Sequence, residues 1–104
     1  MTKRELKKLL LDSIMEIQSL GGHAASEISD STRPLSDLEG FDSLNATEVT
    51  VFLSEKTGCE VEVDIFYPSL ESCRQRDPEN ALTMDEILEK LNLVVGAQGE
   101  RSDG

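Results

Sequence analysis

Apolar residues recur every three or four positions in three segments of this 104-residue chain, over residues 2–22, 43–58 and 83–93. This spacing is typical of amphipathic helices, each of which buries one face. No such face can be buried except against the others, so we expect one aliphatic core that joins three long helices. The predicted members of this core are Leu9, Leu10, Ile14, Ile17, Val49, Phe52, Leu53, Ile87, Leu88 and Leu91.

Residues that begin and end helices mark the limits of these segments. Thr2 and Thr83 each precede a glutamate by three positions, which is the spacing of a capping box. Glycines at 21–22 and Gly58 are the expected ends of the first two helices, because glycine adopts the left-handed terminal conformation readily. The third helix is expected to end near Asn92 or Leu93.

The connections between the helices differ in character. Residues 22–42 form a long first loop rich in Ser, Asp and Gly. Residues 59–63 alternate like a strand, but nothing else in the sequence could pair with them, so we expect an extended connector. Ser69 can cap a short helix after Pro68, and residues 74–80 are a polar loop. Four apolar residues are expected to pin the first loop over the helix ends: Ile28, Leu35, Leu38 and Phe41.

The predicted fold is therefore all-α, with three long helices, a short third helix between the second and the last, and a long first loop. A chain of this length can bury one modest core, so residues 1–95 are expected to form one domain. Residues 96–104 are mostly small and charged, and we expect them to be a disordered tail.

Charge narrows the range of functions. The chain has 21 acidic and 10 basic residues, which gives a formal net charge of -11. Nucleic acids are bound through Lys and Arg clusters, so this balance argues against nucleic-acid binding and favours partners with basic surfaces.

No apolar run is long enough to span a bilayer, and the N-terminus has no signal-like apolar stretch, so we expect a cytoplasmic protein without membrane insertion. Cys59 and Cys73 lack the spacing of a zinc site and are expected to be thiols, with no metal bound.

The candidate functional residues lie where the long loop meets the second helix. Asp42 or Ser43 can cap that helix, and Ser43 then presents its hydroxyl at the positive end of the helix dipole. Such a place favours a bound phosphate. Taken alone, Asp42-Ser43-Leu44 is more simply explained as a helix cap followed by the first core leucine, since capping uses the same residue types.

The surroundings of this tripeptide point to a family. With the helix of residues 43–57 that follows it, the stretch from Asp37 to Leu44 resembles the attachment site of acyl carrier proteins, and the resemblance extends from Leu6 to Leu93. It implies a four-helix bundle in which Ser43, flanked by Asp42 and Leu44, carries 4′-phosphopantetheine. A phosphopantetheinyl transferase would attach this arm, whose thiol would hold acyl groups as thioesters. The protein itself would have no catalytic residues.

The same resemblance implies where partner enzymes would bind. In this family, acidic residues along the helix after the serine meet basic patches on partners, and Glu48 and Glu55 match such positions. They lie two turns apart and therefore share a side of the helix. Two solvated glutamates would be an equally good interpretation of either residue alone. The implied partners are the transferase and acyl-transferring or condensing enzymes with basic docking patches, and we expect the chain to be a monomer.

Some positions depart from the family pattern and leave the pathway open. The segment from Phe66 to Ser69 is similar to one in carrier domains of polyketide and nonribosomal peptide synthases, whereas simple fatty acid carriers are shorter here. The pathway is therefore either fatty acid synthesis or a specialised lipid or polyketide pathway. Thr47 stands where the family usually has an apolar residue, and Phe52 where it has a small one, so both positions are expected to alter which acyl groups are sheltered.

Two other classes of protein compete with a carrier. A small acidic helical protein that binds a basic partner without a prosthetic group would share the charge and the helices, but it gives no reason for Ser43. An enzyme would need a nucleophile, a base and a stabilising group in one pocket. His23 is the single histidine, and nothing in the sequence places it near Ser43, so we interpret it as a solvated loop residue.

Overall fold

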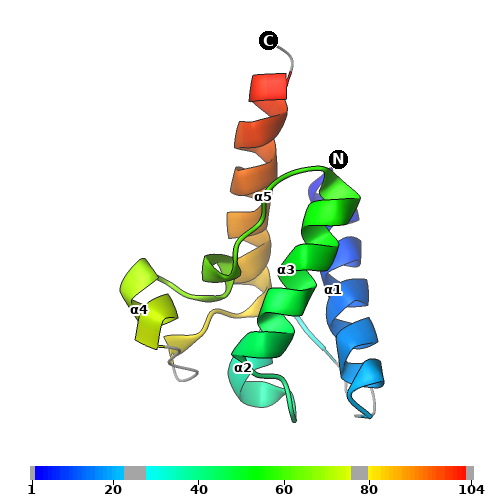
Figure 1. The fold of residues 1–104 in the computed structure, drawn as a ribbon, viewed down its shortest axis with the longest axis vertical. Coiled ribbons are helices and arrows are strands. Elements are labelled where there is room, and N and C mark those ends of the chain that lie inside the picture. Colours follow the sequence, from blue (N-terminus) through cyan, green and yellow to red (C-terminus); the bar gives the residue numbers. More distant parts are fainter. Residues whose placement is uncertain (1, 23–27, 76–79, 103–104) are drawn as a thin grey trace.

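The computed structural model describes residues 2–22, 28–75 and 80–102 (Figure 1). Every regular element in these ranges is a helix, as predicted. The short third helix is also present, and it is preceded by a single turn of 3-10 helix, η1. The elements are α1 Lys3–Leu20, α2 Pro34–Asp37, α3 Ser43–Thr57, η1 Val63–Phe66, α4 Leu70–Gln75 and α5 Met84–Ser102. His23 lies outside the described residues, as does much of the loop expected at 74–80.

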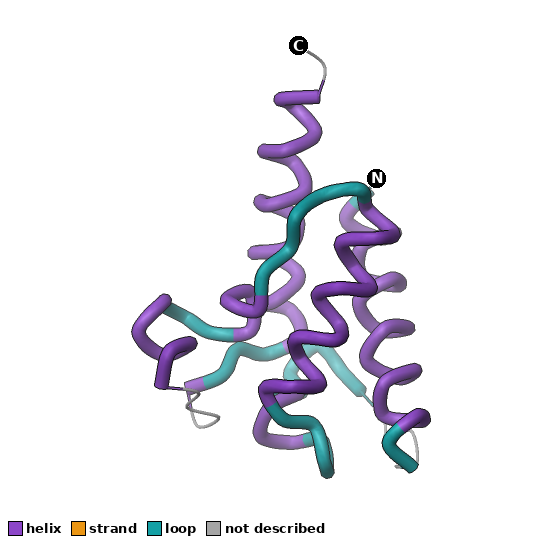
Figure 2. The backbone as a smooth tube through the Cα atoms, viewed as in Figure 1, coloured by secondary structure: helices purple, strands orange, loops and turns teal. Residues whose placement is uncertain are grey.

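The three long helices form the body of the fold. Helix α1 packs against both α3 and α5, while η1 contacts α3, α4 and α5. After α3 the connector turns back and leads to η1 (Figure 2). Helix α4 lies at the side of the bundle, and the C-terminal part of α5 projects beyond the other helices (Figure 1). No helix in the described ranges is both long and apolar enough to cross a membrane.

The predicted starts of α1 and α5 and the predicted end of α3 are confirmed in detail. The Thr2 hydroxyl accepts a hydrogen bond from the Glu5 N–H at 3.2 Å, and the Glu5 carboxylate accepts one from the Thr2 N–H at 2.9 Å. Thr83 and Glu86 form the same reciprocal box at the start of α5. Gly58 ends α3 with a φ of 71°, a left-handed backbone conformation that is strained for residues with a Cβ.

The last helix is longer than the sequence predicted. The expectation that it ends near Asn92 or Leu93 is wrong, because α5 continues to Ser102 through part of the expected disordered tail. Gly96 and Gly99 lower helix propensity by about 1 kcal/mol each relative to alanine, but neither removes a backbone hydrogen bond as proline would. The small and charged residues after Leu93 therefore did not suffice to end the helix there.

The predicted core is largely confirmed. Seven of its members are buried, and Leu9 and Ile17 are partly buried against it. Segments between the long helices supply much of the rest of the core. They include three of the four residues expected to pin the first loop, and the whole Ile65–Tyr67 segment. The buried predicted residues are Leu10, Ile14, Val49, Leu53, Ile87, Leu88 and Leu91, and the loop residues are Leu35, Leu38 and Phe41.

Phe52 corrects the predicted facing of α3. It is only half-buried and lies outside the core cluster, and the Lys56 ammonium stands 5.5 Å from the centre of its ring. The buried residues of α3 are instead Ala46, Val49, Thr50 and Leu53. Phe52 therefore gives no reason to expect a smaller acyl cavity.

Polar contacts fix the connections against the helices. The Arg33 guanidinium donates to the Ala81 carbonyl at 2.6 Å, which ties the first loop to the segment before α5. The Lys90 ammonium donates to the Tyr67 carbonyl at 2.8 Å, at the end of η1. The Ser69 hydroxyl accepts from the Ser72 N–H at 3.1 Å, so Ser69 caps α4 as predicted.

The capping box of α5 predicts that part of the stability of the fold is lost at acid pH. Hydrogen bonds from the Thr83 N–H and hydroxyl lower the pKa of the Glu86 carboxyl. Because the folded pKa lies below the unfolded value of about 4.3, this stabilisation is complete above that value and is lost as the pH falls through the folded pKa. Glu86→Gln keeps an accepting oxygen without titrating, so it should lose less stability between pH 7 and acid pH than the wild type.

Urea unfolding midpoints at neutral pH and near pH 3.5 would measure this difference. Glu62→Gln is the matched control, because Glu62 precedes η1 and makes no capping hydrogen bond with its side chain. The control should keep the pH dependence of the wild type. An equal pH dependence for Glu86→Gln and the wild type would contradict the assignment.

Candidate functional site

Two contacts and a glycine turn position the loop that leads into α3. The Gln18 side chain, which is buried near the end of α1, donates to the Glu39 carbonyl at 3.1 Å. Gly40 then takes a φ of 73°, a turn conformation that favours glycine. Phe41 enters the core, with its ring centre 6.1 Å from that of Phe66. The chain therefore reaches α3 from a fixed direction.

Asp42, rather than Ser43, is the N-cap of α3. Its carboxylate accepts hydrogen bonds from the N–H groups of Leu44 at 3.0 Å and Asn45 at 3.1 Å. The Asn45 side chain accepts in return from the Asp42 N–H at 3.1 Å. Two amides of the first turn are thus already bound to a negative group, so a phosphate attached at this helix start would face Asp42 rather than a set of vacant donors.

Ser43 is the first residue of α3 and is half-buried. In the described part of the chain its hydroxyl makes no hydrogen bond, whereas its carbonyl accepts one from the Thr47 hydroxyl at 2.9 Å. No histidine, lysine or carboxylate is hydrogen-bonded to the Ser43 hydroxyl among these residues. The hydroxyl can therefore be modified from outside, but nothing described here activates it as a nucleophile.

A hollow lies beside Ser43, between the start of α3, η1 and α4. It holds about 300 Å³ of empty space and is partly open to solvent. We call it the Ser43 hollow, and it is lined by Ser43, Leu44, Thr47, Val63, Tyr67 and Cys73.

Leu44 is not the core leucine that the sequence predicted. Its side chain is 69% exposed, because at the start of α3 it faces away from α1 and the core. Val51, another apolar residue of α3, is 54% exposed. With Glu48 and Glu55, which are also exposed, these residues follow one side of α3 at spacings of four, three and four. We call Leu44, Glu48, Val51 and Glu55 the α3 stripe.

The charges of the α3 stripe are not neutralised within the part of the chain that the structure describes. The ion pairs there join Lys3 to Glu89, Lys7 to Asp30 and Lys8 to Asp12. Neither Glu48 nor Glu55 takes part in them, so both carboxylates face solvent from a surface that also exposes two apolar side chains.

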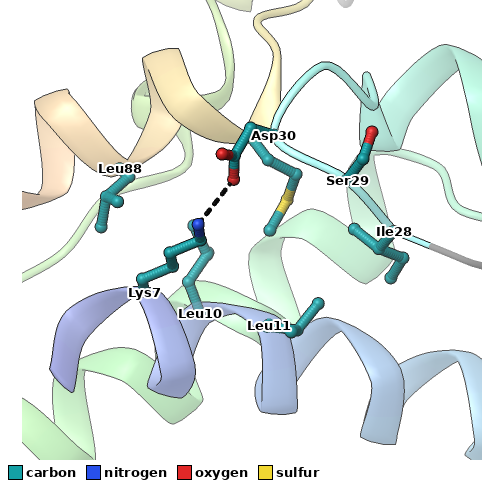
Figure 3. A pocket seen from close by; sticks show the side chains of 8 residues that line it. Lys7, Leu10, Leu11, Ile28, Ser29, Asp30 and Leu88 are labelled. Carbon is teal, nitrogen blue, oxygen red and sulfur yellow. Dashed lines mark ion pairs between the residues drawn. The ribbon is translucent and has the colours of Figure 1, made fainter. Parts of the chain in front are cut away.

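A second hollow lies elsewhere, between α1, residues 28–30 and the start of α5. It holds about 280 Å³ of empty space, and an ion pair between Lys7 and Asp30 spans it at 2.8 Å (Figure 3). Leu10, Leu11 and Leu88 line its apolar part. It shares no residue with the Ser43 hollow, and its lysine and aspartate are paired with each other, so we treat it as a gap in packing rather than as a candidate site.

The sequence did not identify several residues that shape the site. Gln18 lies one turn after Ile14 and interrupts the apolar face of the first helix. A polar residue at such a position was the signal in the sequence that could have indicated a buried polar contact. Tyr67 and Cys73 line the Ser43 hollow, although no spacing in the sequence links them to Ser43. Cys59 and Cys73 are not joined in a disulfide, as expected.

The family of this chain follows from a comparison with known proteins. Residues 8–73 match the family model of the phosphopantetheine attachment site. This match covers more than half of the chain and includes Ser43, so the chain belongs to that family of carrier proteins. No curated protein and no solved structure gives a significant match.

Membership in the family establishes the general role of the chain. It is a phosphopantetheine carrier and not an enzyme, and the prosthetic group of the family is 4′-phosphopantetheine bound covalently to a serine. Carriers of this kind work with a phosphopantetheinyl transferase and with enzymes that handle acyl groups. The residues around Ser43 fit such a group, since the Ser43 hydroxyl makes no hydrogen bond to any of the residues that the structure describes and borders an open hollow.

Proposed function

We propose that Ser43 is the serine that carries the arm, and that the protein holds acyl intermediates and presents them to partner enzymes. The observation that supports this most directly is the Ser43 hydroxyl itself, half-exposed and without a hydrogen bond in the described chain, at a helix start within the matched region. When bound, 4′-phosphopantetheine supplies a thiol that holds the acyl group as a thioester.

The side chains of the protein have positioning roles in this proposal. Asp42 fixes the first turn of α3 and so sets the direction of the Ser43 hydroxyl. Gln18 and Phe41 hold the preceding loop, so the attachment point does not move with that loop. Leu44 flanks Ser43 and remains exposed, where a partner enzyme can contact it.

Loading with a prosthetic group tests this function directly. The purified protein would be incubated with coenzyme A and a transferase of broad specificity, and its intact mass measured. Addition of one phosphopantetheine to Ser43 supports the proposal. Absence of any addition would instead favour an acidic helical protein that binds a basic partner without a prosthetic group.

The pathway and setting are part of the same proposal. We propose that the carrier acts as a cytoplasmic monomer in fatty acid synthesis or in a specialised lipid or polyketide pathway. The segment from η1 to α4 supports specialisation, because Tyr67 and Cys73 from this segment line the Ser43 hollow. Acyl-transferring or condensing enzymes with basic docking patches would be its partners.

The α3 stripe is the proposed docking surface for these partners. A partner that reaches Ser43 approaches the start of α3, and Glu48 lies one turn beyond it with Glu55 two turns further. Exposed charges of this kind steer association and act mainly on the on-rate. Glu48→Lys should therefore lower kcat/KM for the transferase at low salt, and added salt should lower the wild-type rate.

A matched control separates local steering from net charge. Glu16→Lys makes the same change in charge at an exposed position of α1, away from the stripe. It should leave transferase kinetics closer to wild type than Glu48→Lys does. Equal kinetics for the wild type and Glu48→Lys at low salt would leave the glutamates as solvated surface.

A further inference from the structure

The lining of the Ser43 hollow is chemically mixed. Val63 and Tyr67 supply apolar surface, whereas Thr47 and Cys73 bring a hydroxyl and a thiol. Thr47 lies four residues after Ser43, so the two side chains are neighbours on the same side of α3. A saturated chain placed here would remove water from the Thr47 hydroxyl without replacing its hydrogen bonds, which costs free energy.

The hydrogen-bonding direction of Thr47 is set by the backbone. Its single hydroxyl proton is donated to the Ser43 carbonyl at 2.9 Å. The oxygen retains lone pairs that can accept, so toward the hollow Thr47 acts as an acceptor. A ligand group that donates a hydrogen bond complements the Thr47 oxygen, whereas a carbonyl, which only accepts, does not.

The buried wall of the hollow limits the length of the acyl group that it can receive. Tyr67 forms part of its wall and is itself only 2% exposed. Phe66, which precedes Tyr67 in the chain, is fully buried in the core. Protein cores are close-packed, so a long chain would have to displace these side chains to enter.

We propose that the Ser43 hollow receives a short acyl group that bears a hydrogen-bond donor, a hydroxyl or an amine, in preference to a long saturated chain. This inference rests on the attachment of the arm to Ser43. The acidic surface of the chain adds attraction for a protonated amine.

Rates of thioester hydrolysis can test this preference. The protein would be loaded with butyryl, β-hydroxybutyryl, β-aminobutyryl, β-oxobutyryl and octanoyl forms of the arm, and each rate would be divided by that of the same acyl group on free pantetheine. We expect the β-hydroxy or the β-amino form to hydrolyse about three- to ten-fold more slowly than the butyryl form after this correction, the gain of one hydrogen bond. The β-oxo and octanoyl forms should show no such protection.

A pair of variants assigns the effect to Thr47. Thr47→Val should reduce the protection of the β-hydroxy form to the level of the butyryl form. Thr57→Val is the control, because Thr57 donates to the carbonyl four residues before it at 2.8 Å in the same way, near the far end of α3. That control should keep the protection.

The outcomes separate this inference from the function on which it rests. Failure of every acyl form to load at Ser43 would overturn the proposed function, and this inference with it. Normal loading with equal protection of the butyryl, β-hydroxy and β-amino forms would overturn this inference alone. So would stronger protection of the octanoyl form than of the short forms.

Discussion

Ser43→Ala is expected to abolish loading by a phosphopantetheinyl transferase. The substitution removes the hydroxyl to which the phosphate of the arm would be bound, and no other group at the start of α3 can replace it. Asp42 is the N-cap, so both of its bonds to the first turn remain. We therefore expect the free energy of unfolding to fall by less than about 1 kcal/mol. Intact mass after incubation with coenzyme A measures the loading, and urea unfolding measures the stability.

Ser69→Ala is the matched control for this experiment. Ser69 is also a serine at the start of a helix, where it accepts a hydrogen bond from the Ser72 N–H at 3.1 Å. If only Ser43 carries the arm, this variant should load fully, even though it loses a cap. Full loading of Ser43→Ala would show that another residue is modified and would end the assignment.

The sequence predicted the start of each long helix correctly, because the signals there are local. A capping residue and its partner lie within three positions of each other, as with Thr2 and Glu5 or Asp42 and Asn45, so no knowledge of the fold is needed. The end of α5 was predicted poorly because the local signals there are weak. Small and charged residues after Leu93 favoured a disordered tail, but none of them stops a helix as proline does, and α5 continues through Gly96 to Ser102.

The facing of α3 was predicted only in part from its own residues, since Val49 and Leu53 are buried as expected but Phe52 is not. Apolar side chains surround much of this helix, so the helical period does not select one buried side. The position of α1 and η1 decides it, and both pack against α3 from the side of Val49 and Leu53. Leu44 and Phe52 were consequently assigned to the wrong environment.

The candidate site was predictable in part. Asp42, Ser43 and Leu44 are adjacent in sequence, and their place before an acidic helix was sufficient to select them as candidates. The Ser43 hollow was not predictable, because its walls come from three elements. Val63 and Cys73 reach it only because η1 packs against both α3 and α4.

Phe66→Ala is expected to lower the free energy of unfolding by about 4 kcal/mol. The ring is fully buried and packs at a tilt against Phe41, so its removal loses buried apolar surface and leaves a cavity between the site loop and η1. Domains of this size are stable by roughly 5–15 kcal/mol, so the loss would be a large part of the total. Chemical denaturation in moderate salt, which limits repulsion among the acidic groups, would measure it.

Phe52→Ala provides the comparison that makes this prediction specific. It deletes the same ring from a half-buried position outside the core, where the side chain contacts the Lys56 ammonium. We expect a loss of about 1 kcal/mol or less, from partial burial and one exposed cation–π contact. A loss near 3 kcal/mol for Phe52→Ala would mean that α3 turns this ring into the core in solution. The same rotation would move Glu48 and Glu55, and the docking surface proposed for the α3 stripe would then lie on a different side of the helix.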